Sequence, residues 1–376
     1  MLGASGDVHF AVAHPLSDVT HAGDTAVASD TIAVGFIGAG SICTENHLPG
    51  LQKLDGVEVL AVCNRSRASG EKVAAKFHVP HVEEGWRKLI ARDDLDAVFI
   101  GTWPYTHKDM SIATLEAGKH CFCQARMAMN VDEARQMLAA AKRHADLVNM
   151  ISPCPFPMEL YIRHAVKSGM LGQITSFELK ADSGANMNRS SVTFRERREL
   201  SGNQALAMGI FSEALIAIFG PYASLSAQTA ITIDTKTDDS GRNVKIDVPQ
   251  TVTISGQLAS GALGVEHHTG LAVDTTSGVE LTIWGLEGTL RSDFSTNVEM
   301  ARPGEALKAV QVPPDMVHHW NVESDFIGAV RAARAGKPAS ERPVRPDFAE
   351  GLLYMQKVEA VHRSAATGQA VRPAEL

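Results

Sequence analysis

One segment, Ile32–Cys43, constrains the fold of this 376-residue chain more than any other. A short run of β-forming apolar residues breaks at Gly38 and Gly40, and a helical pattern begins at Ser41 and Ile42. Gly38 allows a tight turn, and Gly40 lets a ligand approach the backbone without meeting a Cβ atom. The free N–H groups at the start of the helix would point at phosphates. The segment therefore predicts a dinucleotide-binding strand, turn and helix.

The residues that follow the second predicted strand, 57–62, bear on the choice of dinucleotide. An acidic residue at the end of that strand binds the ribose 2′-hydroxyl of NAD and repels the phosphate of NADP. Here the position holds Asn64, and Arg65, Ser66 and Arg67 offer donors to a phosphate. We therefore expect NADP as the cofactor, with NAD as the alternative.

Composition limits the class of protein. With 44% hydrophobic and 21% charged residues, the chain can bury the cores of two domains. The net charge of −8 gives no reason to expect nucleic acid or an anionic membrane as a partner. No apolar window of about 20 residues predicts a transmembrane helix. The five cysteines include no CxxC pair, which favours reduced thiols in a cytoplasmic protein.

The pattern along the chain predicts three regions and an α/β plus α+β fold. Residues 1–30 contain no Lys or Arg, so they lack the basic region of a secretory signal, and we expect an N-terminal arm. Residues 31–150 alternate strands and helices, which predicts a Rossmann domain with a parallel sheet. Residues 151–376 carry alternating strands around one helical segment, 205–219, which predicts a largely antiparallel sheet with helices on one face. Closing helices are expected at about 322–365.

Four motifs in this order resemble the Gfo/Idh/MocA family, the glucose-fructose oxidoreductase and inositol dehydrogenase group. They are residues 38–42 (GAGSI), 115–120 (LEAGKH), 169–174 (GMLGQI) and 287–290 (EGTL). The resemblance implies a Rossmann domain followed by an open-faced β-sheet domain, a nicotinamide cofactor and a small-molecule substrate. It also implies a homo-oligomer, a dimer or tetramer, that packs through the C-terminal sheet.

The sequence departs from the family at three polar positions. Members usually carry Glu-Lys-Pro where this chain has Gln124, Ala125 and Arg126, and the missing lysine normally sits beside the nicotinamide. Members also carry an Asp and a His four residues apart, where this chain has Ala207 and Phe211. A positioned acid or base contributes about 10² to 10⁴ in rate. Ordinary sugar dehydrogenase activity is therefore not expected.

Four residues are candidates for the missing chemistry. Arg126 is suited to clamp a substrate carboxylate or phosphate, or it caps a helix or forms an ion pair. On the predicted helix 205–219, Glu213 lies about 200° from Phe211 at 100° per residue, so a structural ion pair is its alternative role. Tyr105 is placed to stack on a substrate or donate a proton to it. His107 either seats the following helix or takes part in chemistry.

Further residues are expected to border the cofactor because they follow strands of the predicted parallel sheet. They are Thr102, Trp103, Pro104, His107, Gln124 and Ala125.

Two histidine pairs suggest a metal but do not predict one. They are Glu266-His267-His268 and His318-His319. Adjacent residues on a strand face opposite sides of the sheet, so neither pair chelates from one strand.

Three functions follow from these residues. The first is an NADP- or NAD-dependent oxidoreductase that transfers hydride to or from a small substrate other than a polyol, such as an unsaturated, aromatic or halogenated acid. The second is a redox-neutral lyase or glycosidase that uses the nicotinamide transiently. The third is a sensor that binds a dinucleotide without turnover.

Overall fold

The computed structural model describes residues 31–187, 190–273 and 278–376. The predicted arm, residues 1–30, lies outside the described residues. The first domain holds a six-stranded sheet in the order β3-β2-β1-β4-β5-β6, and every pairing is parallel. This order reverses between β1 and β4, which is where a Rossmann fold binds its ligand. The predicted Rossmann domain is confirmed. Its strands are β1 (Ile32–Ile37), β2 (Val57–Cys63), β3 (His81–Val82), β4 (Ala97–Ile100), β5 (His120–Cys123) and β6 (Asn149–Ile151).

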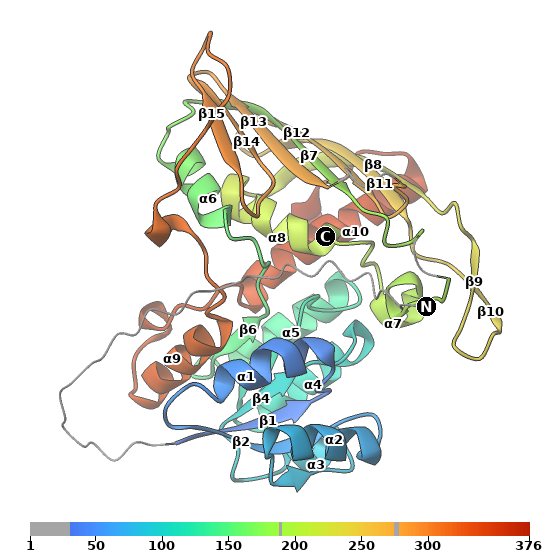
Figure 1. The fold of residues 1–376 in the computed structure, drawn as a ribbon, viewed down its shortest axis with the longest axis vertical. Coiled ribbons are helices and arrows are strands. Elements are labelled where there is room, and N and C mark those ends of the chain that lie inside the picture. The colour runs from blue at the N-terminus through green and yellow to red at the C-terminus, as the bar shows by residue number, and fades with distance from the viewer. Residues whose placement is uncertain (1–30, 188–189, 274–277) are drawn as a thin grey trace.

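Helices cover both faces of this sheet (Figure 1). One buried cluster lies against α3 (Trp86–Ile90), α4 (Pro104–Glu116) and α5 (Val131–Arg143). A second cluster, on the other face, lies against the π-helix η1 (Cys43–His47), α1 (Leu48–Leu51) and α2 (Arg67–Phe77). Coverage of both faces explains why β1, β4 and β5 are buried along their whole length.

The second domain holds an eight-stranded sheet in the order β16-β15-β14-β13-β7-β12-β11-β8. Only the β7–β12 pair among these strands is parallel, so the prediction of a largely antiparallel sheet is confirmed. A small hairpin, β9 (Thr235–Thr237) and β10 (Asn243–Lys245), stands apart. The sheet strands are β7 (Ile174–Asp182), β8 (Tyr222–Ala230), β11 (Thr251–Leu258), β12 (Leu263–Thr269), β13 (Val279–Gly285), β14 (Gly288–Ser292), β15 (Val298–Ala301) and β16 (Lys308–Ala309).

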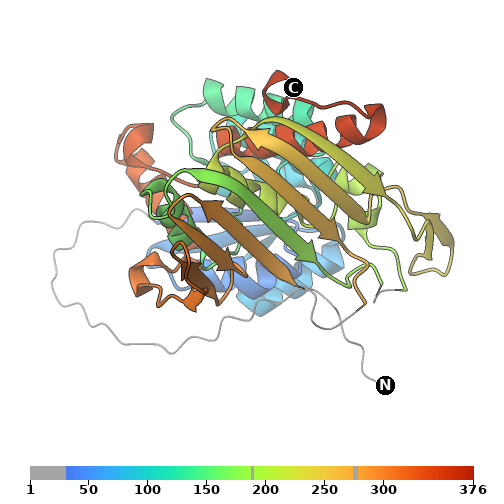
Figure 2. The same cartoon turned by 90° about the horizontal axis from the view of Figure 1, so that it is seen from above.

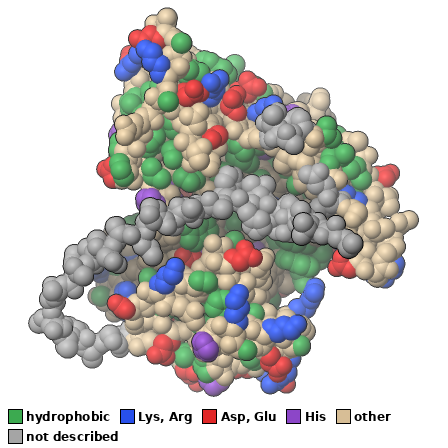
Figure 3. Space-filling view, in the orientation of Figure 1, with side chains coloured by type: hydrophobic (Ala, Val, Ile, Leu, Met, Phe, Trp, Pro, Cys, Tyr) green, Lys and Arg blue, Asp and Glu red, His purple; other side chains and the backbone are tan. Residues whose placement is uncertain are grey.

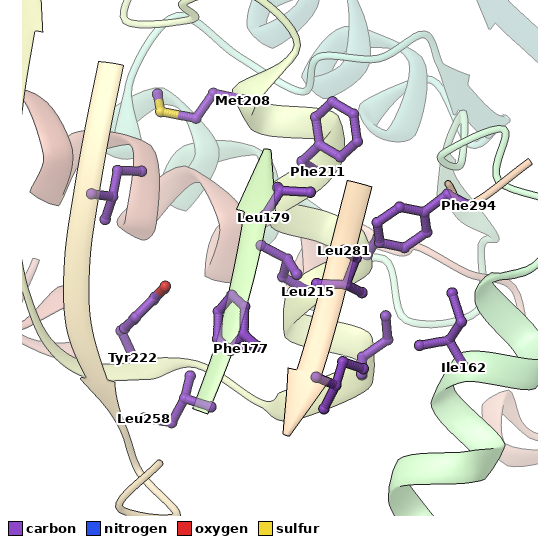
Figure 4. Close-up of a cluster of buried hydrophobic side chains, with 14 of the residues drawn as sticks. Ile162, Phe177, Leu179, Met208, Phe211, Leu215, Tyr222, Leu258, Leu281 and Phe294 are labelled. Carbon is purple, nitrogen blue, oxygen red and sulfur yellow. The ribbon is translucent and has the colours of Figure 1, made fainter. Parts of the chain in front are cut away.

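One face of this sheet is open and the other packs on helices (Figure 2). The packed face lies on α6 (Glu159–Lys167), α8 (Met208–Phe219) and α10 (Phe348–Thr367). Figure 4 shows the resulting core, in which Phe177 and Leu281 of the strands face Leu215 of α8. The helix α8 starts at Met208, three residues after the predicted start at 205.

Two closing helices tie the domains together. The helix α9 (Val322–Arg334) buries Phe326 and Val330 in the first domain's core, although the sequence pattern grouped it with the second domain. Phe326 meets the Phe99 ring edge-on at a centroid distance of 5.2 Å. The longer α10 contributes its start to the first-domain core and its end to the second-domain core. The chain therefore returns to the first domain after completing the second sheet.

Short helical turns complete the described chain: η2 (Phe194–Glu196), α7 (Arg198–Ser201), η3 (Pro314–Met316), η4 (Ala339–Glu341) and η5 (Pro373–Glu375). Figure 3 shows acidic and basic side chains interspersed over this face of the molecule. None of the helices in the described ranges is both long and apolar enough to span a membrane.

Candidate active site at the domain interface

The glycine turn forms a cradle at the end of β1. Gly38 has a φ of +80°, and a Cβ atom there would lie 2.5 Å from Cγ2 of Thr102. A Cβ atom on Gly40 would meet no atom within 4 Å, so this residue faces open space. Helical structure begins at Ser41 and continues through Ile42. The first glycine is therefore required by the turn, and the second leaves room for a ligand.

Cys43, where the fingerprint usually has a third small residue, packs the helix onto β4. A Cβ atom on Gly101 would lie 2.3 Å from Cys43 Sγ, so the thiol fills the space that this glycine leaves. Burial raises the pKa of Cys43 to about 12, so the group stays a neutral thiol.

Asn64 is used inside the turn. Its Oδ1 accepts a hydrogen bond of 2.7 Å from the Ala39 N–H, and its Nδ2 lies 3.5 Å from the Ala39 carbonyl oxygen. The side chain therefore holds the glycine turn against the end of β2, and it places no negative charge there.

The three residues after Asn64 have separate roles. The Arg65 guanidinium lies 5.7 Å from the centroid of the Trp103 ring. Ser66 caps α2 by accepting from the N–H of Ser69. Arg67 pairs with Glu71 at 2.8 Å on the surface. Arg65 is thus the residue of this group that faces the loop after β4.

His107 connects two strand ends. It is buried, its Nε2 lies 2.9 Å from the Thr102 carbonyl oxygen, and its Nδ1 lies 2.8 Å from the Arg126 carbonyl oxygen. Burial lowers its pKa. With both ring nitrogens facing backbone carbonyls, His107 seats α4 against the loop after β5. Pro104 begins that helix, and Tyr105 on it is 47% exposed.

Trp103 joins the two domains. Its ring stacks on the Phe194 ring at 4.9 Å and 10°, and Phe194 comes from the second domain. The guanidinium of Arg195 lies over the same Phe194 ring, 4.6 Å from its centroid. Glu196 anchors this turn through a buried 2.7 Å ion pair with Lys236. The sequence did not predict Phe194, because its role depends on the approach of a distant segment.

Arg126 is the buried cation of the interface. It is 8% exposed and donates from Nη2 to the Leu206 carbonyl. Its Nε has no hydrogen-bond partner among the described residues. Burial and the charge of Arg195 lower the pKa of Arg126 to about 9. Gln124 and Ala125 precede it at the end of β5, where the Ala125 N–H donates to Gln124 Oε1 at 3.3 Å.

The start of α8 lies against Arg126. Leu206, two residues before the first residue of α8, has a φ of +52°, an unfavourable value for a non-glycine residue. Ala207 at the N-cap provides no side-chain hydrogen bond. A Cβ atom on Gly209 would lie 3.7 Å from Arg126 Cδ and 2.5 Å from Gln204 Oε1. The helix therefore presents an uncapped N-terminus beside a buried guanidinium.

Phe211, at the position of the family's histidine, belongs to an aromatic cluster. Its ring stacks on Phe156 at 5.0 Å and lies 6.1 Å from Phe294. Figure 4 shows Phe211 beside Phe294 at the end of the second-domain core. Apolar rings have thus replaced a polar group here.

Glu213 faces the segment after β6. Its Oε1 accepts from the Cys154 N–H at 2.9 Å. Burial, reinforced by Glu159 and Glu350, raises its pKa to about 8, so the carboxyl holds its proton at neutral pH. No ion pair among the described residues includes Glu213, so the structural ion pair offered as its alternative role is not present there.

A second buried polar cluster lies under the second sheet. Glu266 Oε1 lies 2.6 Å from Lys357 Nζ and accepts from the Tyr222 hydroxyl at 2.9 Å, and Oε2 lies 3.0 Å from His268 Nε2. Burial alone would raise the pKa of Glu266, but Lys357 and His268 lower it to about 2. From the sequence, a metal site was considered for Glu266 and His268 and not predicted, and their contact with each other was not foreseen. Their i, i+2 spacing, which places both on one face of a strand, was the signal for this cluster.

His267 faces the opposite side of β12 and pairs with Asp182 at 2.8 Å. Within residues 31–187, 190–273 and 278–376, no group of three or more His, Cys, Asp or Glu is arranged to hold a metal ion.

Comparison with protein families identifies both domains. Residues 32–151 match the family described as "Oxidoreductase family, NAD-binding Rossmann fold", and residues 160–291 match the "GFO/IDH/MocA C-terminal domain".

Curated relatives match over part of their length. An uncharacterized oxidoreductase of Synechocystis is 28% identical over 240 residues, which is 62% of this chain and 64% of the relative. An alpha-N-acetylgalactosaminidase of Shewanella oneidensis is 32% identical over 156 residues, which is 39% of this chain and 34% of that enzyme. The chain thus spans less than two thirds of either relative.

Solved structures share the fold. Levoglucosan dehydrogenase in its apo form superposes with a TM-score of 0.80 at 20% identity, covering 91% of this chain and 98% of that one. The WlbA dehydrogenase of Chromobacterium violaceum, in complex with NADH and UDP-GlcNAcA, gives 0.74 at 20% identity, covering 92% and 97%. At these identities the likeness establishes the fold alone.

Proposed function

The chain belongs to the Gfo/Idh/MocA family of NAD-binding oxidoreductases, and we propose that it transfers hydride to or from a small anionic substrate that Arg126 holds. The observation that carries this proposal is the unpartnered Nε of a buried arginine at the domain interface. A guanidinium N–H that has no partner in the protein can donate a charge-assisted hydrogen bond to a carboxylate.

The surroundings of Arg126 favour an anion. The N-terminus of α8 adds the positive end of a helix dipole, and Arg195 adds a second positive charge nearby. The aromatic rings of Phe156 and Phe211 line the adjoining core. These groups suit a small carboxylate with an apolar or aromatic part better than a polyol, whose hydroxyls would need polar partners.

The glycine cradle supports a bound dinucleotide, since Gly38 fits only without a Cβ atom and Gly40 faces open space. The nicotinamide, when bound, accepts or donates hydride. We propose NADP as the preferred form, because Asn64 introduces no charge that would repel a 2′-phosphate and Arg65 faces the same loop.

A redox-neutral glycosidase is the second candidate. The resemblance of part of the chain to an alpha-N-acetylgalactosaminidase supports it. The apolar rings at the position of Phe211 speak against it, because the hydroxyls of a sugar would need polar partners there. A dinucleotide sensor without turnover is the third candidate.

We also propose that the chain forms a homo-oligomer through the open face of the second sheet. Ser176 of β7 pairs with Leu263 of β12 on one side and with Trp284 of β13 on the other. Val265 lies two residues after Leu263 and faces the same side of the sheet. Leu263, Trp284 and Val265 are 56%, 37% and 48% exposed, respectively, on a face that none of the described helices covers.

The experiment that tests the proposed function starts with dialysed protein. Denaturation and mass spectrometry identify any retained nucleotide, and titration compares NADPH with NADH. The protein is then assayed at 340 nm with small hydroxy, oxo and unsaturated acids and with inositol and glucose. The proposal predicts reversible binding, tighter for NADPH, and turnover of an acid. Retained NAD that never exchanges would favour the glycosidase or sensor, and dehydrogenase rates with inositol or glucose would contradict the proposal.

A further inference from the structure

His268 lies in the second-domain core with one ring nitrogen facing a buried carboxylate. Its Nε2 lies 3.0 Å from Glu266 Oε2, and Glu266 is ionised because Lys357 lies 2.6 Å from its other oxygen. An ionised carboxylate only accepts hydrogen bonds, so Nε2 must carry the imidazole proton. In the neutral ring Nδ1 is then an acceptor. It is buried, and no described residue donates to it.

The position of this acceptor relates it to the proposed site. The His268 ring lies 5.8 Å from the ring of Phe211, the residue that stands where the family's histidine is expected. Two residues further along the chain, a Cβ atom on Gly270 would lie 2.9 Å from Leu206 Cδ2. Leu206 is also the residue whose carbonyl Arg126 contacts. His268 and Arg126 therefore approach the same turn of α8 from opposite domains.

We propose that His268 replaces the missing histidine as the proton-transfer group, and that the substrate is a small hydroxy acid or the corresponding oxo acid. This inference rests on the proposed function. Arg126 holds the carboxylate, and Nδ1 of His268 accepts the hydroxyl proton. As the O–H bond breaks and C=O forms, the carbon-bound hydrogen leaves with its electron pair to the oxidised nicotinamide. Glu266 stabilises the imidazolium, as a carboxylate does for a catalytic histidine.

Three groups face or adjoin His268, and each is consistent with this role. Glu266 fixes the tautomer, while Lys357 and the Tyr222 hydroxyl neutralise and hold Glu266. The proposal requires the Phe211 ring, whose centroid lies 5.8 Å from that of the imidazole, to move when substrate binds. Glu213, the other titratable candidate, keeps its proton at neutral pH and is therefore poorly suited to accept one.

The test uses the full-length protein labelled with [¹⁵N]histidine, in the presence of NADP⁺. The ring nitrogens of His268 are assigned as the signals that disappear in His268→Gln, whose amide can still donate to Glu266. Lactate is the probe, and propionate is its match without the hydroxyl. The proposal predicts an unprotonated Nδ1 whose resonance shifts with lactate but not with propionate. Arg126→Gln should abolish the shift.

The outcomes separate this inference from the proposed function. If neither acid binds, the carboxylate site is wrong and both fail. If both acids bind through Arg126 but shift Nδ1 equally or not at all, or if Nδ1 is protonated in the free protein, only the role of His268 is overturned.

A kinetic measurement follows with the hydroxy acid that the substrate assay identifies. His268→Gln should lower kcat by about 10² to 10⁴ with little change in KM. His267→Gln, on the opposite face of the same strand, is the matched control and should keep normal kcat. Loss of rate in Glu213→Gln but not in His268→Gln would assign the proton transfer to Glu213 and overturn the proposal.

Discussion

Replacing Lys357 by methionine removes the positive charge that holds Glu266 ionised in the core. The side chains are 2% and 0% exposed, and Nζ lies 2.6 Å from Oε1. Lys357 and His268 lower the pKa of Glu266 to about 2, although burial alone would raise it. Breaking one side of a buried ion pair typically costs about 3–5 kcal/mol. Lys357→Met should therefore lower the free energy of unfolding by about 3–5 kcal/mol at neutral pH.

The sign of the pH dependence follows from the direction of the shift. In the unchanged protein the contribution of Glu266 is complete above pH 4.5 and is lost as the pH falls towards about 2. Without Lys357, burial dominates and raises the pKa of Glu266, so the carboxylate is protonated at a higher pH. The stability difference between the two proteins should therefore be widest at pH 8 and narrower at pH 4.5.

Urea unfolding followed by circular dichroism measures this difference at both pH values. The double variant Glu266→Gln with Lys357→Met is the control, because it leaves no uncompensated charge and should recover most of the loss. A loss below about 1 kcal/mol at neutral pH, or a difference that is the same at both pH values, would refute the reasoning about the buried pair.

Three further predictions concern the cofactor site and the contact between the domains. Gly38→Ala should abolish dinucleotide binding, measured by calorimetry, because φ is +80° and the new Cβ would lie 2.5 Å from Thr102 Cγ2. Unchanged affinity would contradict the assignment of this turn as the dinucleotide site. Asn64→Asp keeps an oxygen that can accept from the Ala39 N–H but adds a negative charge. It should therefore weaken NADPH binding by about 1–3 kcal/mol and leave the affinity for NADH unchanged. An equal effect on both affinities would remove the argument for NADP. Phe194→Ala removes the partner of Trp103, so it should raise the exposure of that indole to acrylamide quenching; unchanged quenching would show that the stack is absent in solution.

The fold was largely predictable because its signals are local. The glycine turn at residues 38–40 and the alternation of strands and helices up to 151 each depend on short stretches of sequence. The membership of α9 in the first domain was not predictable, because an amphipathic helix shows which face is buried but not which core receives it. Phe326 shows this, since it packs on Phe99 more than 200 residues away.

The candidate site was predictable only in part, for the same reason. The sequence singled out Arg126, but burial between two domains is what leaves its Nε without a partner. His267 and His268 face opposite sides of β12, as expected of adjacent strand residues, but the contact of His268 with Glu266 on the buried face was not predicted. Phe194 carried no local signal, since its partner Trp103 lies in the other domain.

The measurement that tests the central claim most directly is the affinity of a small carboxylate for the NADP⁺-bound protein, compared between the unchanged protein and Arg126→Gln. Glutamine keeps a neutral donor but removes the charge and the guanidinium fork. If Arg126 holds the substrate anion, the dissociation constant of lactate should rise at least about tenfold, equivalent to about 1.4 kcal/mol, while NADP⁺ binding stays unchanged. Equal lactate affinity in the two proteins would contradict the account.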